Sequence, residues 1–342
     1  MQALVLAGGQ GTRLRPLTLT TPKPVLPLAG RPLLTFMLDW LAAHGIDDVI
    51  LSCGFLAADV ERILGDEYRG TTLRYVTEDT PLGTAGPVSL AARDGLVDQR
   101  LFVLNGDVLT DIDLTDQLRQ HERNGAVATL ALVAVGDTAS YGVVPTAADG
   151  RVEAFLEKSA GPAPTDRINA GAYILEREVI DAIPAGRAVS FEREVFPNLT
   201  GRGLFGYHAE GYWIDVGTPE RYLEATYDLL TGRVESSLPP RDEHDSLVYD
   251  GVAAAGARIG PLSVLGSGCS IGPDSLIERS VLHDGVSVGS GCVISESVLG
   301  DHVRVEDGAR IGPGAVAGSG ATVAATAIVG SGARIAPGET VQ

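Results

Sequence analysis

Apolar positions in residues 1–230 alternate between strand-like and helix-like spacing. Short continuous apolar runs at 4–6, 49–51, 101–104 and 127–135 are typical of buried strands. Between them, apolar residues recur at helical spacing in two sets: Leu34, Met37, Leu38 and Leu41, then Leu56, Val60 and Ile63. This order predicts an α/β fold with a Rossmann-like, doubly wound and mostly parallel sheet. Ligands bind such sheets at the carboxyl ends of the strands.

The pattern changes after residue 230. Residues 231–247 are polar and include a Pro-Pro pair, which predicts a linker. In residues 248–342 glycine is dense, and aliphatic residues recur every six positions in two sets: Ile259, Leu265, Ile271, Ile277, then Leu299, Val305, Ile311, Ala317, Val323, Val329, Ile335, Val341. Such repeats predict a left-handed parallel β-helix, and the phase slip between the two sets predicts one or two irregular corners. We therefore expect one domain over 1–230 and another over 248–342.

The composition of the chain disfavours several classes of binding partner and site. The formal net charge of −18 disfavours nucleic acid and anionic membrane surfaces as partners, so any bound phosphate needs a local cationic pocket. The three cysteines are far apart and form no paired motif, which disfavours a disulfide framework or a zinc site. Because the N-terminal apolar run is too short for a signal peptide, we expect a cytoplasmic protein.

A glycine-rich segment, residues 6–27, follows the first predicted strand. Three glycines let its backbone approach a phosphate, and three cations supply positive charge: Gly8, Gly9, Gly11, Arg13, Arg15 and Lys23. A dinucleotide-binding G-x-G-x-x-G motif is excluded because Leu14 occupies the position of the third glycine. Only Lys23 and Lys158 are lysines among 26 basic residues, and both lie inside motifs. We interpret them as positions where an arginine would not serve.

Two acidic positions are candidates for a metal site. Asp107 directly follows the buried strand at 101–104, and Asp215 lies in the motif at 213–218. A pair of carboxylates without basic neighbours in sequence suits Mg²⁺, which would bridge phosphate oxygens. A further motif, residues 78–87, predicts a turn that leads into a helix.

These motifs together resemble those of the sugar-phosphate nucleotidyltransferases, whose signature G-x-G-T-R-L-x-P-L-T-x-x-x-P-K-P is matched at residues 9–24. The resemblance implies transfer of a nucleotidyl group from a nucleoside triphosphate to a sugar 1-phosphate, with release of pyrophosphate and Mg²⁺ as cofactor. It implies catalytic roles for Arg13 and Lys23 and metal binding by Asp107 and Asp215. The implied nucleotide-binding residues are Leu6, Ala7, Gly8, Gly9, Gly11, Thr12, Glu78, Gly83 and Thr84. The implied sugar-phosphate-binding residues are Tyr141, Gly142, Glu157, Lys158, Asn169 and Gly171.

The choice of substrates stays open at this point. Pro22-Lys23-Pro24 resembles the guanylyltransferase branch, and the acceptor-only carboxylate of Glu78 suits the adjacent donors of guanine. GTP and mannose 1-phosphate are therefore favoured over a thymidylyl-, uridylyl- or adenylyltransferase acting on glucose 1-phosphate, and over a cyclitol-phosphate enzyme. A non-catalytic homologue that senses nucleotide sugar is the alternative of another class.

The predicted β-helix has several alternative roles. We expect it to assemble the chain into a homo-oligomer or to make regulatory contacts. Acyltransferases of this architecture use a histidine, for which His283 and His302 are candidates, but a solvated side chain is the commoner role of a histidine there.

Overall fold

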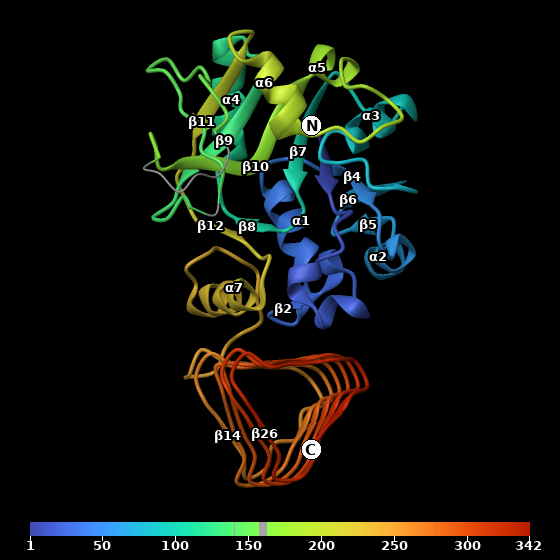
Figure 1. The fold of residues 1–342 in the computed structure, drawn as a ribbon, viewed down its shortest axis with the longest axis vertical. Helices are drawn as coiled ribbons and strands as arrows, with labels where there is room; N and C mark the ends of the chain where they lie inside the picture. Colours follow the sequence, from blue (N-terminus) through green and yellow to red (C-terminus); the bar gives the residue numbers. More distant parts are fainter. Residues whose placement is uncertain (140, 157–162) are drawn as a thin grey trace. The chain divides into compact units, whose positions relative to one another are not determined.

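The computed structural model describes residues 1–139, 141–156 and 163–342, which form two compact units (Figure 1). The first unit contains Met1–Gly9 and Met37–Trp213, and the second contains Gln10–Phe36 and Ile214–Gln342. The chain passes between them within helix α1 (Leu33–Ala43) and within strand β12 (Trp213–Asp215). The glycine-rich segment is therefore divided, because residues 6–9 and residues 10–27 belong to different units.

The first unit is built on an eight-stranded sheet in the order β11-β9-β10-β7-β1-β4-β6-β5. Its strands are β1 (Gln2–Leu6), β4 (Asp48–Cys53), β5 (Glu67–Tyr68), β6 (Thr71–Thr77), β7 (Arg100–Asn105), β9 (Ala128–Ala134), β10 (Arg167–Glu176) and β11 (Leu204–His208). Strand β1 runs parallel to both β4 and β7, whereas β10 runs antiparallel to both of its neighbours. The sheet confirms the predicted doubly wound, mostly parallel architecture.

The first unit also contains several short helices. They are α2 (Ala57–Leu64), α3 (Gly86–Arg93), α4 (Leu114–Asn124), α5 (Arg177–Asp181) and α6 (Phe196–Leu199), with a π-helical turn η4 (Phe191–Val195) and a short strand β8 (Val108–Thr110). Asp113 caps α4 by accepting a hydrogen bond from the backbone N–H of Asp116. The predicted apolar face of α2 is partly wrong: Val60 is buried, but Ile63 is 42% exposed, and Leu64 replaces it in the core.

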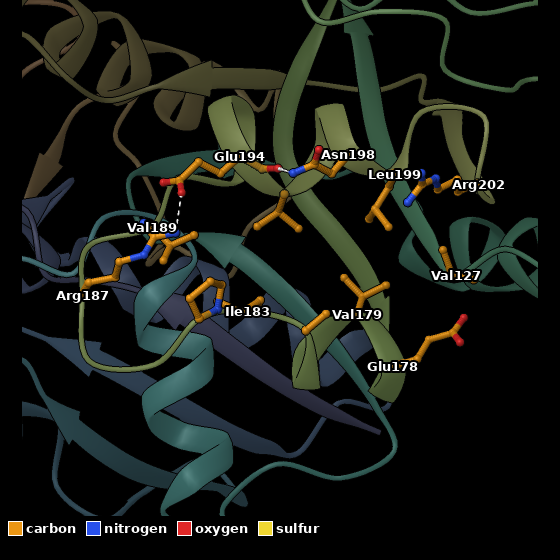
Figure 2. Close-up of a pocket in the computed structure, with 13 residues that line it drawn as sticks. Val127, Glu178, Val179, Ile183, Arg187, Val189, Glu194, Asn198, Leu199 and Arg202 are labelled. Atoms are coloured by element: carbon orange, nitrogen blue, oxygen red, sulfur yellow. Dashed lines mark hydrogen bonds and ion pairs between the residues drawn. The ribbon is translucent and has the colours of Figure 1, made fainter.

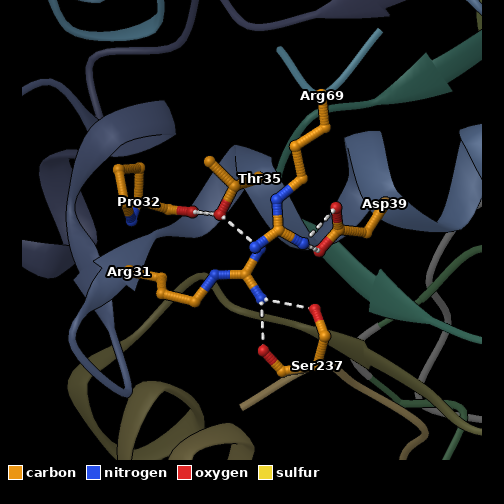
Figure 3. Close-up of polar contacts among 6 residues, drawn as sticks. All are labelled: Arg31, Pro32, Thr35, Asp39, Arg69 and Ser237. Atoms are coloured by element: carbon orange, nitrogen blue, oxygen red, sulfur yellow. Dashed lines mark hydrogen bonds and ion pairs between the residues drawn. The ribbon is translucent and has the colours of Figure 1, made fainter. Parts of the chain in front are cut away.

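The second unit begins with the rest of the glycine-rich segment. This part forms the 3₁₀ turns η1 (Thr12–Leu14), η2 (Leu17–Leu19) and η3 (Lys23–Val25) and the hairpin β2 (Pro27–Leu28) and β3 (Arg31–Pro32). Helix α7 (Pro219–Thr231) starts at Thr218, whose side chain accepts from the N–H of Arg221. Figure 3 shows Arg31 donating to Ser237 and to Thr35, so part of the polar stretch at 231–247 is fixed to the hairpin.

The β-helix has three parallel sheets, seen end-on as a triangle in Figure 1. The first contains β13 (Leu247–Val248), β15 (Val264–Leu265), β18 (Val281–Leu282), β21 (Val298–Leu299), β24 (Val316–Ala317) and β27 (Arg334–Ile335). The second contains β14 (Arg258–Ile259), β17 (Leu276–Glu278), β20 (Val293–Ser295), β23 (Arg310–Ile311) and β26 (Ile328–Val329). The third contains β16 (Ser270–Ile271), β19 (Ser287–Val288), β22 (Arg304–Val305), β25 (Thr322–Val323) and β28 (Thr340–Val341). Every predicted aliphatic position lies in the core of this prism or packs against it, as expected for a left-handed β-helix.

The predicted phase slip has a structural cause. The steps from Ile277 to Leu282 and from Ile294 to Leu299 are each one residue shorter than the repeat. At these corners Arg279 and Glu296 adopt φ values of 49° and 46°. Each is followed by a fully buried serine, Ser280 or Ser297, and the N–H of Ser297 donates to Ser280 Oγ at 3.2 Å. At the shorter corner, the buried hydroxyl of Ser280 thus accepts the hydrogen bond of a backbone N–H group that would otherwise lack a partner in the sheet.

The outer face of the first β-helix sheet is covered by other parts of the second unit. Its outward-facing side chains, at Val264, Val281 and Val298, are at most 1% exposed. Tyr222 and Tyr227 of α7 contact this side, since the Tyr227 hydroxyl donates to the carbonyl of Arg279. The β-helix therefore buries two layers, an aliphatic interior and one exterior face. None of the helices in the described part of the chain is long and apolar enough to cross a bilayer.

Candidate active site

The carboxyl end of β1 lies between those of β4 and β7. The N–H of Ala7, directly after Leu6, donates to the carbonyl of Ser52 at 2.8 Å. Gly8 approaches a side chain closely, because a Cβ atom there would lie 2.7 Å from Glu78 Oε1. Gly9 has open space where its Cβ would be. Any larger residue at position 8 would displace the carboxylate, which explains this glycine by close packing.

Both oxygens of Glu78 accept hydrogen bonds within the first unit. Oε1 accepts from Ser52 Oγ at 2.8 Å, and Oε2 accepts from the N–H of Leu82 at 2.9 Å. The carboxylate of Glu78 therefore stabilises the turn formed by residues 78–82, a structural role that the sequence motif did not indicate. Each oxygen has a second lone pair, so pairing with a guanine base stays a prediction.

The loop formed by residues 82–85, which we call the 82–85 loop, carries the predicted Gly83 and Thr84. It packs against residues 189–192, more than a hundred positions later in the chain. The side chain of Thr84 is directed to this segment, since its hydroxyl donates to Glu192 Oε2 at 2.9 Å. The side chain of Thr84 thus helps to hold the 82–85 loop, for which the sequence predicts a role in nucleotide binding.

The ends of β7 and β10 bring several predicted residues together. Gly106, between Asn105 and Asp107, donates its N–H to the carbonyl of Leu6 at 3.0 Å. The pairing of β10 with β9 shifts register between Asn169 and Tyr173, which marks a bulge. Within this bulge, the N–H of Gly171 donates to Asn169 Oδ1 at 3.0 Å.

The bulge lies directly against the end of β7. A Cβ atom at Gly171 would lie 2.5 Å from Asn105 Nδ2, so these two residues touch. Asn169 Nδ2 also donates to the hydroxyl of the buried Tyr173 at 2.8 Å, which fixes the orientation of the amide. The start of β10, with Asn169 and Gly171, therefore lies beside the carboxyl end of β7, which Asp107 follows by two residues.

Trp213 links the predicted Tyr141 to the bulge and was missed as a functional residue. Its indole N–H donates to the carbonyl of Ala170 at 2.8 Å, and its ring meets Tyr141 edge-on at 5.7 Å. The signal for it was its place in the same motif as Asp215. Gly142 lies close to the backbone of Leu156. The predicted Glu157 and Lys158 fall outside the described residues.

In the second unit, one of the predicted cations, Arg13, lies near the predicted metal ligand Asp215. Arg13 Nη2 is 3.6 Å from Asp215 Oδ2, and Arg13 is exposed while Asp215 is mostly buried. Thr12 begins the turn η1, and Thr18 Oγ1 donates to the carbonyl of Gly11 at 2.7 Å. Lys23 is only 8% exposed and lies beside Gly11. Arg13 and Asp215 thus form an ion pair, which places a positive and a negative group side by side in the second unit.

The candidate metal ligands are chemically suitable for a hard divalent cation. Asp107 and Asp215 both offer carboxylate oxygens, the donors that Mg²⁺ prefers. Among residues 1–139, 141–156 and 163–342, no three His, Cys, Asp or Glu side chains gather into a cluster suited to a metal. Mg²⁺ is usually bound by one or two carboxylates, with water and substrate phosphates as its other ligands.

The two candidate histidines of the β-helix differ in burial. His302 is exposed, as a solvated side chain would be. The solvated interpretation is wrong for His283, which is 4% exposed, with Nε2 at 3.1 Å from the Tyr222 hydroxyl. Burial lowers the pKa of His283 below its usual value although Asp301 and Asp284 oppose this effect. The Tyr222 hydroxyl also donates to the carbonyl of Pro27, so His283 is part of a buried structural contact.

Both parts of the chain are similar to known proteins. Residues 2–232 match the family of nucleotidyl transferases, and residues 250–342 match the GMPPB C-terminal domain. The chain is 46% identical to a mannose-1-phosphate guanylyltransferase of Mycobacterium tuberculosis, over 82% of this chain and 79% of the relative. It is 35% identical to mannose-1-phosphate guanyltransferase beta-B of Xenopus laevis, over 79% of this chain and 74% of the relative.

A solved structure has a similar fold. It is HddC from Yersinia pseudotuberculosis complexed with GMP-PN, with a TM-score of 0.56 and 29% sequence identity. The similarity covers 66% of this chain and 97% of that chain.

Proposed function

Because this chain belongs to the nucleotidyl transferase family, we propose that it transfers the guanylyl group of GTP to mannose 1-phosphate and releases pyrophosphate. The observation that carries this proposal is the 46% identity to a mannose-1-phosphate guanylyltransferase over most of both chains. The proposed catalytic domain is residues 1–230, joined by the linker 231–247 to the β-helix domain 248–342.

The proposed reaction is a single in-line displacement at the α-phosphorus. An oxygen of the sugar phosphate attacks, the bond to the pyrophosphate oxygen breaks, and pyrophosphate leaves. The attacking oxygen is already ionised at neutral pH, so no protein base is needed. Positioning and charge stabilisation then supply most of the rate acceleration. Arg13 and Lys23 hold the triphosphate and stabilise its developing charge.

The remaining proposed roles follow the resemblance of the sequence motifs to those of the nucleotidyltransferases. The nucleotide-binding residues are Leu6, Ala7, Gly8, Gly9, Gly11, Thr12, Glu78, Gly83 and Thr84. The sugar phosphate is held by Tyr141, Gly142, Asn169 and Gly171, together with Glu157 and Lys158. Asn169 and Gly171 are oriented for this by the bulge in β10.

Asp107 and Asp215 are the proposed ligands of Mg²⁺. When bound, the ion neutralises charge on the phosphate oxygens during transfer. The oxygen donors of the two carboxylates support this assignment. Arg13 Nη2 lies 3.6 Å from Asp215 Oδ2, so both side chains would be close to the bound phosphates.

We place the protein in the cytoplasm and assign the β-helix a role in homo-oligomer assembly. The three cysteines are free and buried, and burial raises the pKa of Cys53 to about 12, so this thiol stays protonated and unreactive. These properties suit a reducing compartment.

The proposal is tested with a matrix of substrates. Pyrophosphate release is measured for each of the four nucleoside triphosphates with mannose 1-phosphate and with glucose 1-phosphate, in the presence of Mg²⁺. We expect GTP with mannose 1-phosphate to give the highest kcat/KM. A higher value for another pair would reassign the substrates, and no release with any pair would favour the non-catalytic homologue.

A further inference from the structure

The 82–85 loop is held by a segment that lies more than a hundred positions later in the chain, residues 189–192. The N–H of Val189 donates to the carbonyl of Leu82 at 2.9 Å, and the N–H of Ala85 donates to the carbonyl of Val189 at 2.9 Å. Gly83, between them, has a φ of 74°, and a Cβ there would lie 2.5 Å from the Val189 carbonyl oxygen. The two backbones therefore touch with no room for a side chain at position 83.

One carboxylate oxygen fastens this contact. Glu192 Oε2 accepts a hydrogen bond from Thr84 Oγ1 at 2.9 Å and another from Ser190 Oγ at 2.7 Å. Thr84 Oγ1 in turn accepts from the N–H of Phe191 at 2.8 Å. Hydrogen bonds to an ionised acceptor are stronger than those between neutral groups, so Glu192 is the strongest polar link between the loop and the segment.

Val189 and Phe191 of this segment are buried in the core of the first unit, where the Phe191 ring stacks on that of Phe196. A cavity of about 470 Å³ borders the segment, as Figure 2 shows for Val189 and Glu194. Val179, Ile183 and Leu199 form the other side of this cavity. Core packing of Val189 and Phe191 therefore holds the segment on one side, and the hydrogen bonds of Glu192 fasten the 82–85 loop to it.

Glu192 also acts on the residue that orients Asn169. Tyr173 is fully buried, and its ring lies 5.4 Å from that of Phe191, next to Glu192 in the chain. Burial raises the pKa of the Tyr173 hydroxyl, and the negative charge of Glu192 raises it further. This hydroxyl accepts a hydrogen bond from Asn169 Nδ2. The segment that carries Glu192 therefore contacts both the 82–85 loop, through Thr84, and the residue that orients Asn169, through Phe191.

We propose that Glu192 is a positioning residue for nucleotide binding, which acts through Thr84 by fixing the 82–85 loop. This inference rests on the proposed nucleotidyl transfer and adds a residue that lies outside its motifs. Because Oε2 serves as an acceptor for two hydroxyls, an uncharged acceptor of the same shape can replace it in part. Removal of the side chain leaves both hydroxyls without that partner.

Three variants test the proposal: Glu192→Ala, Glu192→Gln and the matched control Glu194→Gln. Glu194 lies in the same turn, and its carboxylate binds Arg187 at 2.7 Å and accepts from the N–H of Ser190 at 3.3 Å, but neither of these partners belongs to the 82–85 loop. The dissociation constant of the nucleotide is measured by calorimetry, using whichever triphosphate the wild-type protein binds most tightly. The KM values of both substrates are measured in parallel.

We expect Glu192→Ala to weaken nucleotide binding by about tenfold, in line with the loss of one or two hydrogen bonds. Its KM for the sugar phosphate should change by less than about threefold. Glu192→Gln should restore most of the nucleotide affinity, and Glu194→Gln should match the wild type. Thr84→Val, which removes the hydroxyl but keeps the shape, should reproduce the defect if Glu192→Ala does not fold.

Equal losses of affinity for both substrates with a lowered Tm would overturn the proposal, because they indicate a general structural role. Unchanged nucleotide affinity in Glu192→Ala would also overturn it. A preference for a nucleotide other than GTP would instead contradict the proposed substrate and leave the role of Glu192 intact. Binding is measured directly, so absence of turnover would not affect this test.

Discussion

The eight-stranded sheet and the β-helix both rely on parallel strands, yet their polar side chains have different roles. Strands such as β7 in the sheet are buried along their length and end in residues that occur once, Asn105 and Asp107. The two- and three-residue strands of the β-helix repeat one inward aliphatic position. Polar residues there recur as well, as the buried serines Ser280 and Ser297 show.

Because of this difference, substitutions in the two regions should affect different properties of the protein. A substitution at a strand end of the sheet removes a unique group from the candidate site but leaves the apolar run behind it intact. A substitution inside the β-helix removes one member of a continuous stack, and each coil is stabilised mainly by its neighbours. We therefore expect the first kind of change to affect turnover and the second kind to affect the free energy of unfolding.

The largest effect is expected at the metal ligands. Asp107→Asn and Asp215→Asn should each reduce kcat by about a hundredfold or more, since each removes a charge that holds the proposed cation. The Tm of both variants should stay within a few degrees of the wild-type value. Steady-state pyrophosphate release and thermal unfolding measure the two quantities. Full activity in excess chelator would contradict the metal assignment.

The opposite result is expected inside the β-helix. Leu299 is fully buried in its core, so Leu299→Ala should lower the free energy of unfolding by about 3 kcal/mol. The kcat of the folded protein should change by less than about twofold. Denaturant unfolding and kinetics at 25 °C provide the comparison. Ile328→Ala is the matched control, because Ile328 is 76% exposed and should change stability by less than about 0.5 kcal/mol.

A smaller effect on turnover is expected from a charge-preserving change. Lys23 is 8% exposed and lies between two prolines, so Lys23→Arg places a longer, planar cation in a confined position. We expect kcat to fall by about tenfold, because the contact with phosphate strengthens as charge develops. Arg62→Lys, at an exposed site, provides the control. Wild-type kinetics for Lys23→Arg would show that an arginine serves equally well at this position.

The smallest effect concerns pH at the buried His283. Its pKa is lower in the folded protein than in the unfolded chain, because burial outweighs the opposing charges of Asp301 and Asp284. Its contribution to stability is therefore present above about pH 6.5 and is lost as the pH falls through the folded-state value. The decrease in Tm from pH 7.5 to pH 5.5 should be smaller in His283→Gln than in the wild type.

The exposed His302 provides the control for that experiment, since His302→Gln should leave the pH dependence of Tm unchanged. An equal decrease in the wild type and in His283→Gln would show that other groups determine acid stability. The Tyr222 hydroxyl, 3.1 Å from His283, stays protonated throughout this range because burial raises its pKa.

The sequence by itself determined the periodic parts of this protein. The six-residue repeat identified the inward aliphatic positions of the β-helix, and the phase slip located the corners at Arg279 and Glu296. Local apolar runs identified the main strands of the sheet, because the period of a pattern depends on neighbours in the chain. The apolar run at 101–104 also placed Asp107 directly after a buried strand, although its role in catalysis stays a prediction.

Only the tertiary structure decided how distant segments support these motifs. It buried His283 against Tyr222, grouped residues 10–36 with the β-helix, and placed Thr84 beside Glu192, which lies 108 positions later in the chain. No local pattern indicates such contacts. They form because buried polar groups need partners, and the fold determines which distant groups come within hydrogen-bonding distance.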